Sequence, residues 1–137
     1  MVRILIFGVF DLLHEGHKFF IRKSREHGDY LIASVARDSY VKKYKDRTPV
    51  HNQEERMKGL KDTGLVDEAV LSDESIGSFE IIRKMNPDCI CIGYDQHSLH
   101  KKLSDWIVEN KRDISIAVIP PFREDTFKTS HLLKDSG

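Results

Sequence analysis

Five short apolar runs, separated by longer and more polar segments, constrain the fold of this chain most strongly. The first run ends in a glycine and is almost uninterrupted, as expected for a central strand of a parallel sheet, whose two faces are both covered by helices. The later runs are similarly short and apolar. We therefore predict strands at residues 3–8 (RILIFG), 30–35 (YLIASV), 67–71 (DEAVL), 89–93 (CICIG) and 115–119 (SIAVI).

The segments between these runs predict the helices that cover such a sheet. Asn52, three residues before Glu55, matches a capping box at a helix start, and Gly28 and Gly64 are expected to end two of the helices. The basic segment 36–50 predicts a loop that can include a short helical turn. Helices are therefore expected at 16–27, 52–62, 78–85 and 98–110, with a further short one from about Thr129.

This alternation of strands and helices predicts one α/β domain over residues 1–137. Right-handed crossovers give a Rossmann-like, doubly wound fold with a mainly five-stranded parallel sheet and helices on both faces. In such sheets, ligands bind beyond the carboxyl ends of the strands, where the strand order reverses. The residues that follow the strands are therefore the first candidates for a functional site.

The composition narrows the class of protein. Lys plus Arg and Asp plus Glu number 22 each, so no net charge attracts the chain to nucleic acid or to a membrane surface. No apolar stretch reaches the ~18 residues of a membrane span, and the N-terminus lacks the layout of a signal peptide. Cys89 and Cys91 alternate on one predicted strand, which favours buried apolar residues over a metal or redox pair and makes a disulfide awkward. We expect a cytoplasmic protein with no nucleic-acid partner and no membrane contact.

The stretch from Gly8 to His17, GVFDLLHEGH, places two histidines where the first strand gives way to a helix. At a helix start, backbone N–H groups lack internal partners and the helix dipole is positive, which suits a phosphate group. Gly16 lets the backbone approach an anion closely, and His14 and His17 can present both rings to one target. Imidazole N–H groups there can stabilise charge that develops on a phosphoryl oxygen.

Taken alone, the residues of this stretch are also compatible with roles that involve no phosphate. The two histidines can be ordinary polar residues at a helix start. A zinc site needs at least one further ligand, and no Cys, His or Asp spacing supplies an obvious one. The Walker pattern GxxxxGK[ST] is absent, so a phosphate site here is not a P-loop.

The same stretch resembles the G-x-F-D-x-x-H-x-G-H signature of the cytidylyltransferase-like nucleotidyltransferases, and the resemblance covers nearly the whole chain. Members of that superfamily join a nucleoside triphosphate to a phosphate-bearing acceptor and release pyrophosphate. The resemblance implies that His14 and His17 contact the triphosphate and stabilise the transition state. It also implies nucleotide contacts for their neighbours Val9, Phe10, Glu15 and Gly16.

Three further regions extend the resemblance. Lys43 and Lys45 lie after the second predicted strand, where relatives place phosphate-binding lysines; a solvated basic loop is the alternative. Asp95 follows the fourth predicted strand, where relatives hold the nucleotide with an acidic residue; an ordinary turn aspartate is the alternative. Arg56 matches an E-x-x-R-like helix position and either reaches the site or pairs with a carboxylate.

The C-terminal part carries the remaining candidates. Phe122 matches a position near the nucleotide in adenylyltransferase relatives, and Arg123 precedes a segment that resembles the family's R…-x-S-T-T region. Hydroxyl and N–H groups of Thr129 and Ser130, at a helix start, would bind triphosphate oxygens, and an N-cap role for Thr129 is compatible with that. The segment departs from the family pattern because Lys128 replaces its first hydroxyl residue.

The resemblance defines the reaction class better than the substrates. The family's archaeal FAD synthases, which use ATP and FMN, share patterns with this chain at 54–56 (EER), 86–88 (NPD) and 93–96 (GYDQ). ATP and FMN are therefore favoured over CTP with glycerol 3-phosphate, and other acceptors, such as sugar phosphates or pantetheine phosphate, stay open. The acceptor pocket is expected between segments 36–50 and 72–78.

The implied mechanism is direct transfer without a covalent enzyme intermediate. We expect His14, His17, Lys45 and Arg123 to be catalytic, with a divalent ion, expected to be Mg²⁺, bridging phosphate oxygens. No residue is predicted as a metal ligand. The resemblance also suggests a homodimer. A non-enzymatic nucleotide-binding module on the same sheet is the rival hypothesis.

Overall fold

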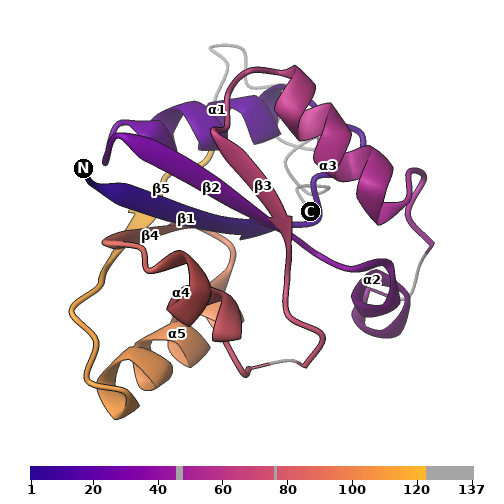
Figure 1. The fold of residues 1–137 in the computed structure, drawn as a ribbon. Helices are drawn as coiled ribbons and strands as arrows, with labels where there is room; N and C mark the ends of the chain where they lie inside the picture. The colour runs from indigo at the N-terminus through magenta and orange to yellow at the C-terminus, as the bar shows by residue number, and fades with distance from the viewer. Residues whose placement is uncertain (46–47, 76, 123–137) are drawn as a thin grey trace.

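The computed structural model describes residues 1–45, 48–75 and 77–122, which form one sheet with helices on both faces (Figure 1). Its strands are β1 (Arg3–Gly8), β2 (Tyr30–Val35), β3 (Glu68–Leu71), β4 (Cys89–Gly93) and β5 (Ser115–Ile119). Its helices are α1 (Glu15–Arg25), α2 (Asp38–Tyr44), α3 (Gln53–Asp62), α4 (Glu80–Met85) and α5 (His97–Glu109).

All four strand pairings are parallel, and the strand order is β3-β2-β1-β4-β5. The chain moves outward from β1 to β3, then returns to the other side of β1 and continues to β5. The order therefore reverses between β1 and β4, which makes their carboxyl ends the expected ligand site. The predicted five-stranded, doubly wound α/β fold is confirmed.

Two separate cores lie on the two faces of the sheet, because successive side chains of a strand point in opposite directions. In β1, Ile4 and Ile6 pack in the core that also contains Ile21 of α1, whereas Leu5 packs in the core that contains Leu103 of α5. Figure 1 shows α1 and α3 on one side of the sheet and α4 and α5 on the other. The uninterrupted apolar run of β1 follows from this double burial.

The two cysteines behave as buried apolar residues, as predicted. Cys89 and Cys91 are both free thiols and both belong to the core beneath α1 and α3. In the described part of the chain, no helix combines the length and the apolar character that a membrane span requires.

The predicted cap is confirmed at the start of α3, whereas the predicted cap at the end of α1 is not. Asn52 Oδ1 accepts from the Glu55 N–H at 2.8 Å, and Glu55 Oε1 accepts from the Asn52 N–H at 2.9 Å, so the predicted capping box is present. The prediction that Gly28 caps α1 is wrong, because the C-cap is Glu26 in an ordinary right-handed conformation. Gly28 is instead required by close packing, since a Cβ there would lie 2.8 Å from the Val2 carbonyl oxygen.

The segment 36–50 contains more structure than predicted. Its first part forms the seven-residue helix α2, not a loop with a single turn. Val41 is the one buried residue of this helix, so no apolar stripe marks the helix in the sequence. Figure 1 shows α2 beyond the carboxyl end of β2, on the side of the sheet edge where the site is expected.

Truncation of Leu103 tests the core beneath α4 and α5. Its side chain is fully buried, so Leu103→Ala is expected to lower the free energy of unfolding by about 2–5 kcal/mol through lost apolar burial and the cavity left behind. Val108→Ala, on the exposed side of the same helix, should change it by less than about 0.5 kcal/mol. Urea denaturation followed by circular dichroism measures both. Equal losses would show that α5 is not packed as described.

Candidate active site

A cavity of about 420 Å³ opens at the carboxyl ends of the strands. Gly8 at the end of β1 and Gly93 at the end of β4 both line it, so it lies at the point where the strand order reverses. Its volume falls in the ~300–1,000 Å³ range of small-molecule sites. The cavity is thus where the fold places a ligand.

His14 and His17 form the start of α1 and line this cavity. His14 is the N-cap residue, and its Nδ1 accepts from the Gly16 N–H at 3.0 Å. In return, the His14 N–H donates to Nδ1 of His17 at 3.2 Å. The two rings stack with their centroids 3.9 Å apart and 26° between their planes. This is a capping box in which imidazole nitrogens replace the usual hydroxyl and carboxylate oxygens.

These bonds fix the proton position on both rings. A ring nitrogen that accepts a hydrogen bond carries no proton, so each neutral imidazole holds its proton on Nε2 and can donate from there. Burial, reinforced by the neighbouring His14 ring and partly offset by Asp11, lowers the pKa of His17 to about 4. His17 is therefore neutral near pH 7 and offers a hydrogen-bond donor without a charge.

Nε2 of His17 is shielded from solvent and has no hydrogen-bond partner among the described residues. A buried donor without a partner costs about 1–3 kcal/mol, so such groups generally mark the place of a ligand or an ordered water. The phosphate oxygens of a nucleotide are suitable acceptors for it.

Gly16 has a different role from the one that its sequence position suggested. Its N–H is already used by the His14 ring, so it is not available to an anion. A Cβ on Gly16 would lie 2.9 Å from Cε1 and 3.1 Å from Nδ1 of His14. Glycine is needed so that the His14 ring can fold back over the helix start.

The loop between β1 and α1 is held in a strained conformation. Phe10 and Leu12 have positive φ angles of 55° and 52°, which cost energy in residues other than glycine. The Phe10 ring folds back over the end of β1, where a Cβ on Gly8 would lie 2.7 Å from it. The same ring meets the edge of the His17 ring at a centroid distance of 5.9 Å.

Asp11 anchors this loop to the segment before α3. Its buried carboxylate accepts from the N–H groups of Val50 at 2.7 Å and His51 at 3.1 Å, and it lies 3.3 Å from the His51 ring. Burial alone would raise the pKa of Asp11, but these contacts outweigh it and the pKa lies below its usual value. The carboxylate is thus committed to the loop and does not serve the cavity.

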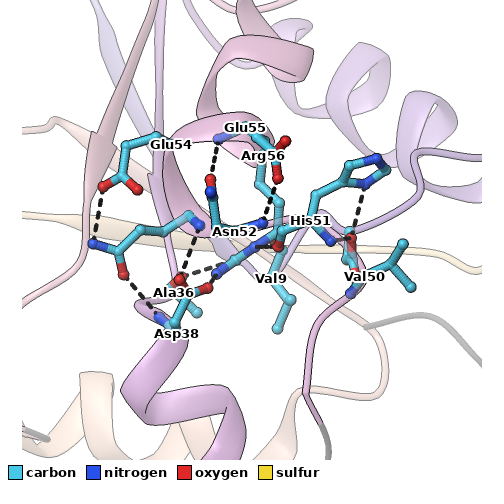
Figure 2. Close-up of polar contacts among 11 residues, drawn as sticks. Val9, Ala36, Asp38, Val50, His51, Asn52, Glu54, Glu55 and Arg56 are labelled. Atoms are coloured by element: carbon cyan, nitrogen blue, oxygen red, sulfur yellow. Dashed lines mark hydrogen bonds and ion pairs between the residues drawn. The ribbon is translucent and has the colours of Figure 1, made fainter.

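The sequence left open whether Arg56 reaches the site or pairs with a carboxylate. In the structure it pairs with a carboxylate and does not line the cavity. Its guanidinium is fully buried and bonds Asp38 together with the carbonyl oxygens of Val9, Ala36 and His51 (Figure 2). It therefore ties the segments that follow β1 and β2 to α3 from behind the site.

Gln96 joins the two strands at the point of reversal. Its Oε1 accepts from the Gly93 N–H at 2.7 Å, and its Nε2 donates to the Phe7 carbonyl oxygen at 3.4 Å. The neighbouring Asp95 is exposed and lines the cavity, and its Oδ1 would lie 3.2 Å from a Cβ on Gly93. Larger residues at position 93 would thus displace the Asp95 carboxylate.

Most of the predicted site residues meet at this cavity. Those that line it are Val9, Phe10, His14, Gly16, His17, Lys45, Asp95 and Phe122. Two candidates are not among the residues that line it: Glu15 is exposed and lies 3.6 Å from Lys18, and Lys43 is exposed with its ammonium over the Tyr44 ring. The remaining candidates lie outside the described residues: Arg123, Thr129 and Ser130.

The cavity also contains residues that the sequence analysis did not single out. Apolar walls come from both cores: Phe19 and Phe20 belong to one, and Phe7, Phe79 and Ile81 to the other. Polar and aromatic groups are added at its edge by Tyr40, Tyr94 and Lys102. Only the strand period carried a usable signal, because it sets Phe7 on the face opposite to Ile6. Tyr40 lies on the unpredicted helix α2, and Lys102 is one of several lysines on α5.

The described residues contain no group of three or more His, Cys, Asp or Glu side chains that can hold a metal ion. This observation gives no support to the zinc alternative.

Comparisons with known proteins point to one family. A family model described as cytidylyltransferase-like matches residues 5–134. The FAD synthases of Thermococcus sibiricus and Pyrococcus abyssi are 35% and 36% identical over 97% of this chain and 90% of their own length. The FAD synthase of Methanosarcina barkeri is 37% identical over 90% of this chain and 87% of its length.

Solved structures show the same fold. The lipopolysaccharide core biosynthesis protein of Thermoplasma volcanium superimposes with a TM-score of 0.82 at 30% identity, over 89% of this chain and 98% of that one. Pantothenate synthetase of Thermus thermophilus, at 13% identity, shares the fold with a TM-score of 0.64 over 90% of this chain and 57% of that one. The chain therefore belongs to the cytidylyltransferase-like family, where it falls with the FAD synthases, and it is a nucleotidyltransferase.

Proposed function

We propose that the protein transfers AMP from ATP to the phosphate of FMN, which gives FAD and pyrophosphate. An oxygen of the FMN phosphate forms a bond to the α-phosphorus as the bond to the bridging β-phosphate oxygen breaks, and the electron pair leaves with pyrophosphate. The observation that carries the proposal is the neutral, buried Nε2–H donor of His17, without a partner among the described residues, in a cavity with an apolar wall on each side.

The two imidazoles supply donors for the phosphates. Their Nε2–H groups extend the positive end of the α1 dipole toward the reacting oxygens, where they offset charge that grows in the transition state. Lys45 adds a cation at the edge of the cavity, and Asp95 and Phe122 flank the nucleoside. The roles expected for Arg123, Thr129 and Ser130 in binding the triphosphate are part of the same proposal.

The apolar walls favour an acceptor with a flat ring. Phe122 packs against Phe19 with ring centroids 5.4 Å apart, and we assign this wall to the adenine side. Phe7 and Phe79 meet edge to face at 6.2 Å on the opposite face of the sheet, and we assign this wall to the isoalloxazine ring. Flat rings gain affinity by packing against aromatic side chains. Glycerol 3-phosphate would leave the second wall uncovered, which is why CTP with this acceptor ranks second.

The divalent ion belongs to the substrate in this proposal. Mg²⁺ would arrive bound to the triphosphate and supply positive charge that polarises the reacting phosphate. The homodimer that the sequence suggested stays a prediction.

A matrix of ATP and CTP against FMN and glycerol 3-phosphate, scored by pyrophosphate release, tests the substrates. Release is expected with ATP and FMN, because adenine and isoalloxazine are the larger flat rings and cover the two apolar walls most fully. If pyrophosphate is released only with CTP and glycerol 3-phosphate, the protein is the second-ranked candidate, a cytidylyltransferase that acts on glycerol 3-phosphate. Nucleotide binding without release from any of the four pairs would contradict the proposed reaction.

Removal of the His17 ring tests the phosphate role. His17→Ala is expected to lower kcat by at least ~10²-fold, the scale of one well-placed hydrogen-bond donor to a developing charge. The matched control is His27→Ala, which removes an exposed histidine just beyond the far end of α1 and should retain the wild-type rate. Near-wild-type turnover of folded His17→Ala would refute the assignment.

The depressed pKa of His17 also predicts a pH dependence of stability. Its value falls from 6.5 to about 4 on folding, so between these pH values the unfolded chain binds the additional proton. The stabilisation is complete above pH 6.5 and is lost as the pH falls toward 4, by about 3 kcal/mol at 1.36 kcal/mol per unit. Urea denaturation at pH 7 and pH 4.5 should show a larger loss for the wild type than for His17→Asn. His27→Ala should lose as much as the wild type, and equal losses for all three proteins would contradict the buried neutral ring.

A further inference from the structure

We propose that Arg56 is a positioning residue for catalysis, which sets the position of α2, and through it that of Lys45, at the cavity. The proposal rests on the proposed function, because it assigns a task to the Lys45 cation. Arg56 itself lies behind the cavity wall and does not line the cavity.

The guanidinium of Arg56 has an unusually complete set of partners. Its Nη1 donates to the carbonyl oxygens of Val9 at 2.9 Å and Ala36 at 2.8 Å, and its Nε donates to that of His51 at 3.1 Å. Its Nη2 bonds Oδ1 of Asp38 at 2.6 Å. The exposed fraction of the Arg56 side chain is 0%. All three guanidinium nitrogens are thus engaged in one fixed geometry (Figure 2).

These partners belong to the parts of the chain that build the site. Val9 follows β1 and Ala36 follows β2, and both line the cavity. Asp38 is the first residue of α2, and Lys45 is its C-cap. A displacement of the guanidinium would therefore move the cavity wall and α2 together.

The packing of α2 depends on the same two residues. Val41, the buried residue of α2, forms a small core cluster with Val9 and Ala36, whose carbonyl oxygens Arg56 holds. Two other described contacts hold the start of α2: a reciprocal pair of bonds between Asp38 and Gln53, at 2.9 and 3.2 Å, and a bond from Nε of the N-cap residue Arg37 to the Ser72 carbonyl oxygen at 2.7 Å. All of them lie at the first turn, and one buried side chain gives little independent rigidity to the rest of a helix this short. We therefore expect the position of α2 to depend on Arg56.

A buried cation is a poor means of gaining stability alone. Its desolvation roughly cancels its attraction to Asp38, and an apolar residue of similar size often stabilises as well. Arginine is distinguished by a planar fork that bonds several acceptors in fixed directions, which lysine cannot reproduce. Arg56→Lys keeps the charge and removes the fork, so it separates geometry from charge.

The test is a double-mutant cycle between Arg56→Lys and Lys45→Met, with kcat for ATP and FMN as the readout. Arg56→Lys alone is expected to lower kcat by at least ~10-fold, as displaced catalytic groups do. If Arg56 acts through Lys45, the same change in the Lys45→Met background should cost less than about 3-fold. The KM values should change less than kcat.

Arg25→Lys is the matched control. Arg25 Nη1 also bonds a carbonyl oxygen, of Leu65 at 2.8 Å, and an aspartate, Asp67 at 3.0 Å, but it is not among the residues that line the cavity. It is expected to retain the wild-type kcat in both backgrounds. A second variant, Asp38→Asn, removes the charge from the link between Arg56 and α2, and with it one carboxylate acceptor of the Gln53 N–H, and should lower kcat in the same non-additive way. It carries the test if Arg56→Lys does not fold.

Amide hydrogen exchange separates this proposal from the proposed function, because it needs no turnover. Arg56→Lys and Asp38→Asn should each speed exchange in residues 38–44 more than in α5, whereas Arg25→Lys should not. If the wild type releases no pyrophosphate but α2 loosens as expected, the proposed function fails and the link from Arg56 to α2 stands. Unchanged exchange in α2, unchanged kcat in folded Arg56→Lys, or a full multiplicative loss in the Lys45→Met background would each overturn the proposal.

Discussion

The reciprocal hydrogen bonds between the start of α1 and two imidazoles are the interaction on which the site depends. Each ring satisfies a backbone N–H through Nδ1 and therefore carries its proton on Nε2. The backbone N–H groups of the helix start thus bond the near side of each ring. The Nε2–H group on the far side of the ring becomes the donor that faces outward. The spacing of His14, Gly16 and His17 follows from this geometry: the histidines take the N-cap and third helical positions, and only glycine leaves room for the first ring. Chains of such bonds strengthen one another in a low-dielectric site.

Two buried charged residues hold the loops that surround this cap. Asp11 fixes the loop after β1 to the segment before α3, and Arg56 fixes the ends of β1 and β2 to α3 and α2. Neither is among the residues that line the cavity. Because buried charges add little net stability even when they are paired, their effect is best understood as the exclusion of other loop positions. The strained φ angles of Phe10 and Leu12 are tolerated for the same reason, since the surroundings leave the loop no alternative.

The sequence predicted the sheet well because a strand that is buried on both faces needs apolar residues at successive positions. This gives an uninterrupted apolar run, as in β1 and β4. The sequence missed α2 because a helix with one buried residue, Val41, has no stripe to detect. The prediction for Gly28 was wrong because two different constraints select glycine. A helix cap requires it for its backbone conformation, whereas here it is required by close packing against the start of the chain. In the site, His14 and His17 stand in a long motif and were found, whereas Phe79 and Lys102 occupy positions that only the tertiary arrangement brings to the cavity. The partners of Arg56 were likewise unpredictable, because three of the four are backbone carbonyl oxygens.

The cavity separates neutral donors from cations, and this division has a physical reason. A buried imidazolium would cost far more to desolvate than a neutral ring, and the lowered pKa of His17 shows that the fold selects the neutral form. Among the described residues that line the cavity, full positive charge lies on the exposed side chains of Lys45 and Lys102, where water limits its desolvation. Cations at the edge can attract an anionic substrate from a distance, whereas donors inside act only on a phosphate that is already in place. Under the proposed function, attraction and orientation therefore belong to different residues, so each can be arranged without weakening the other.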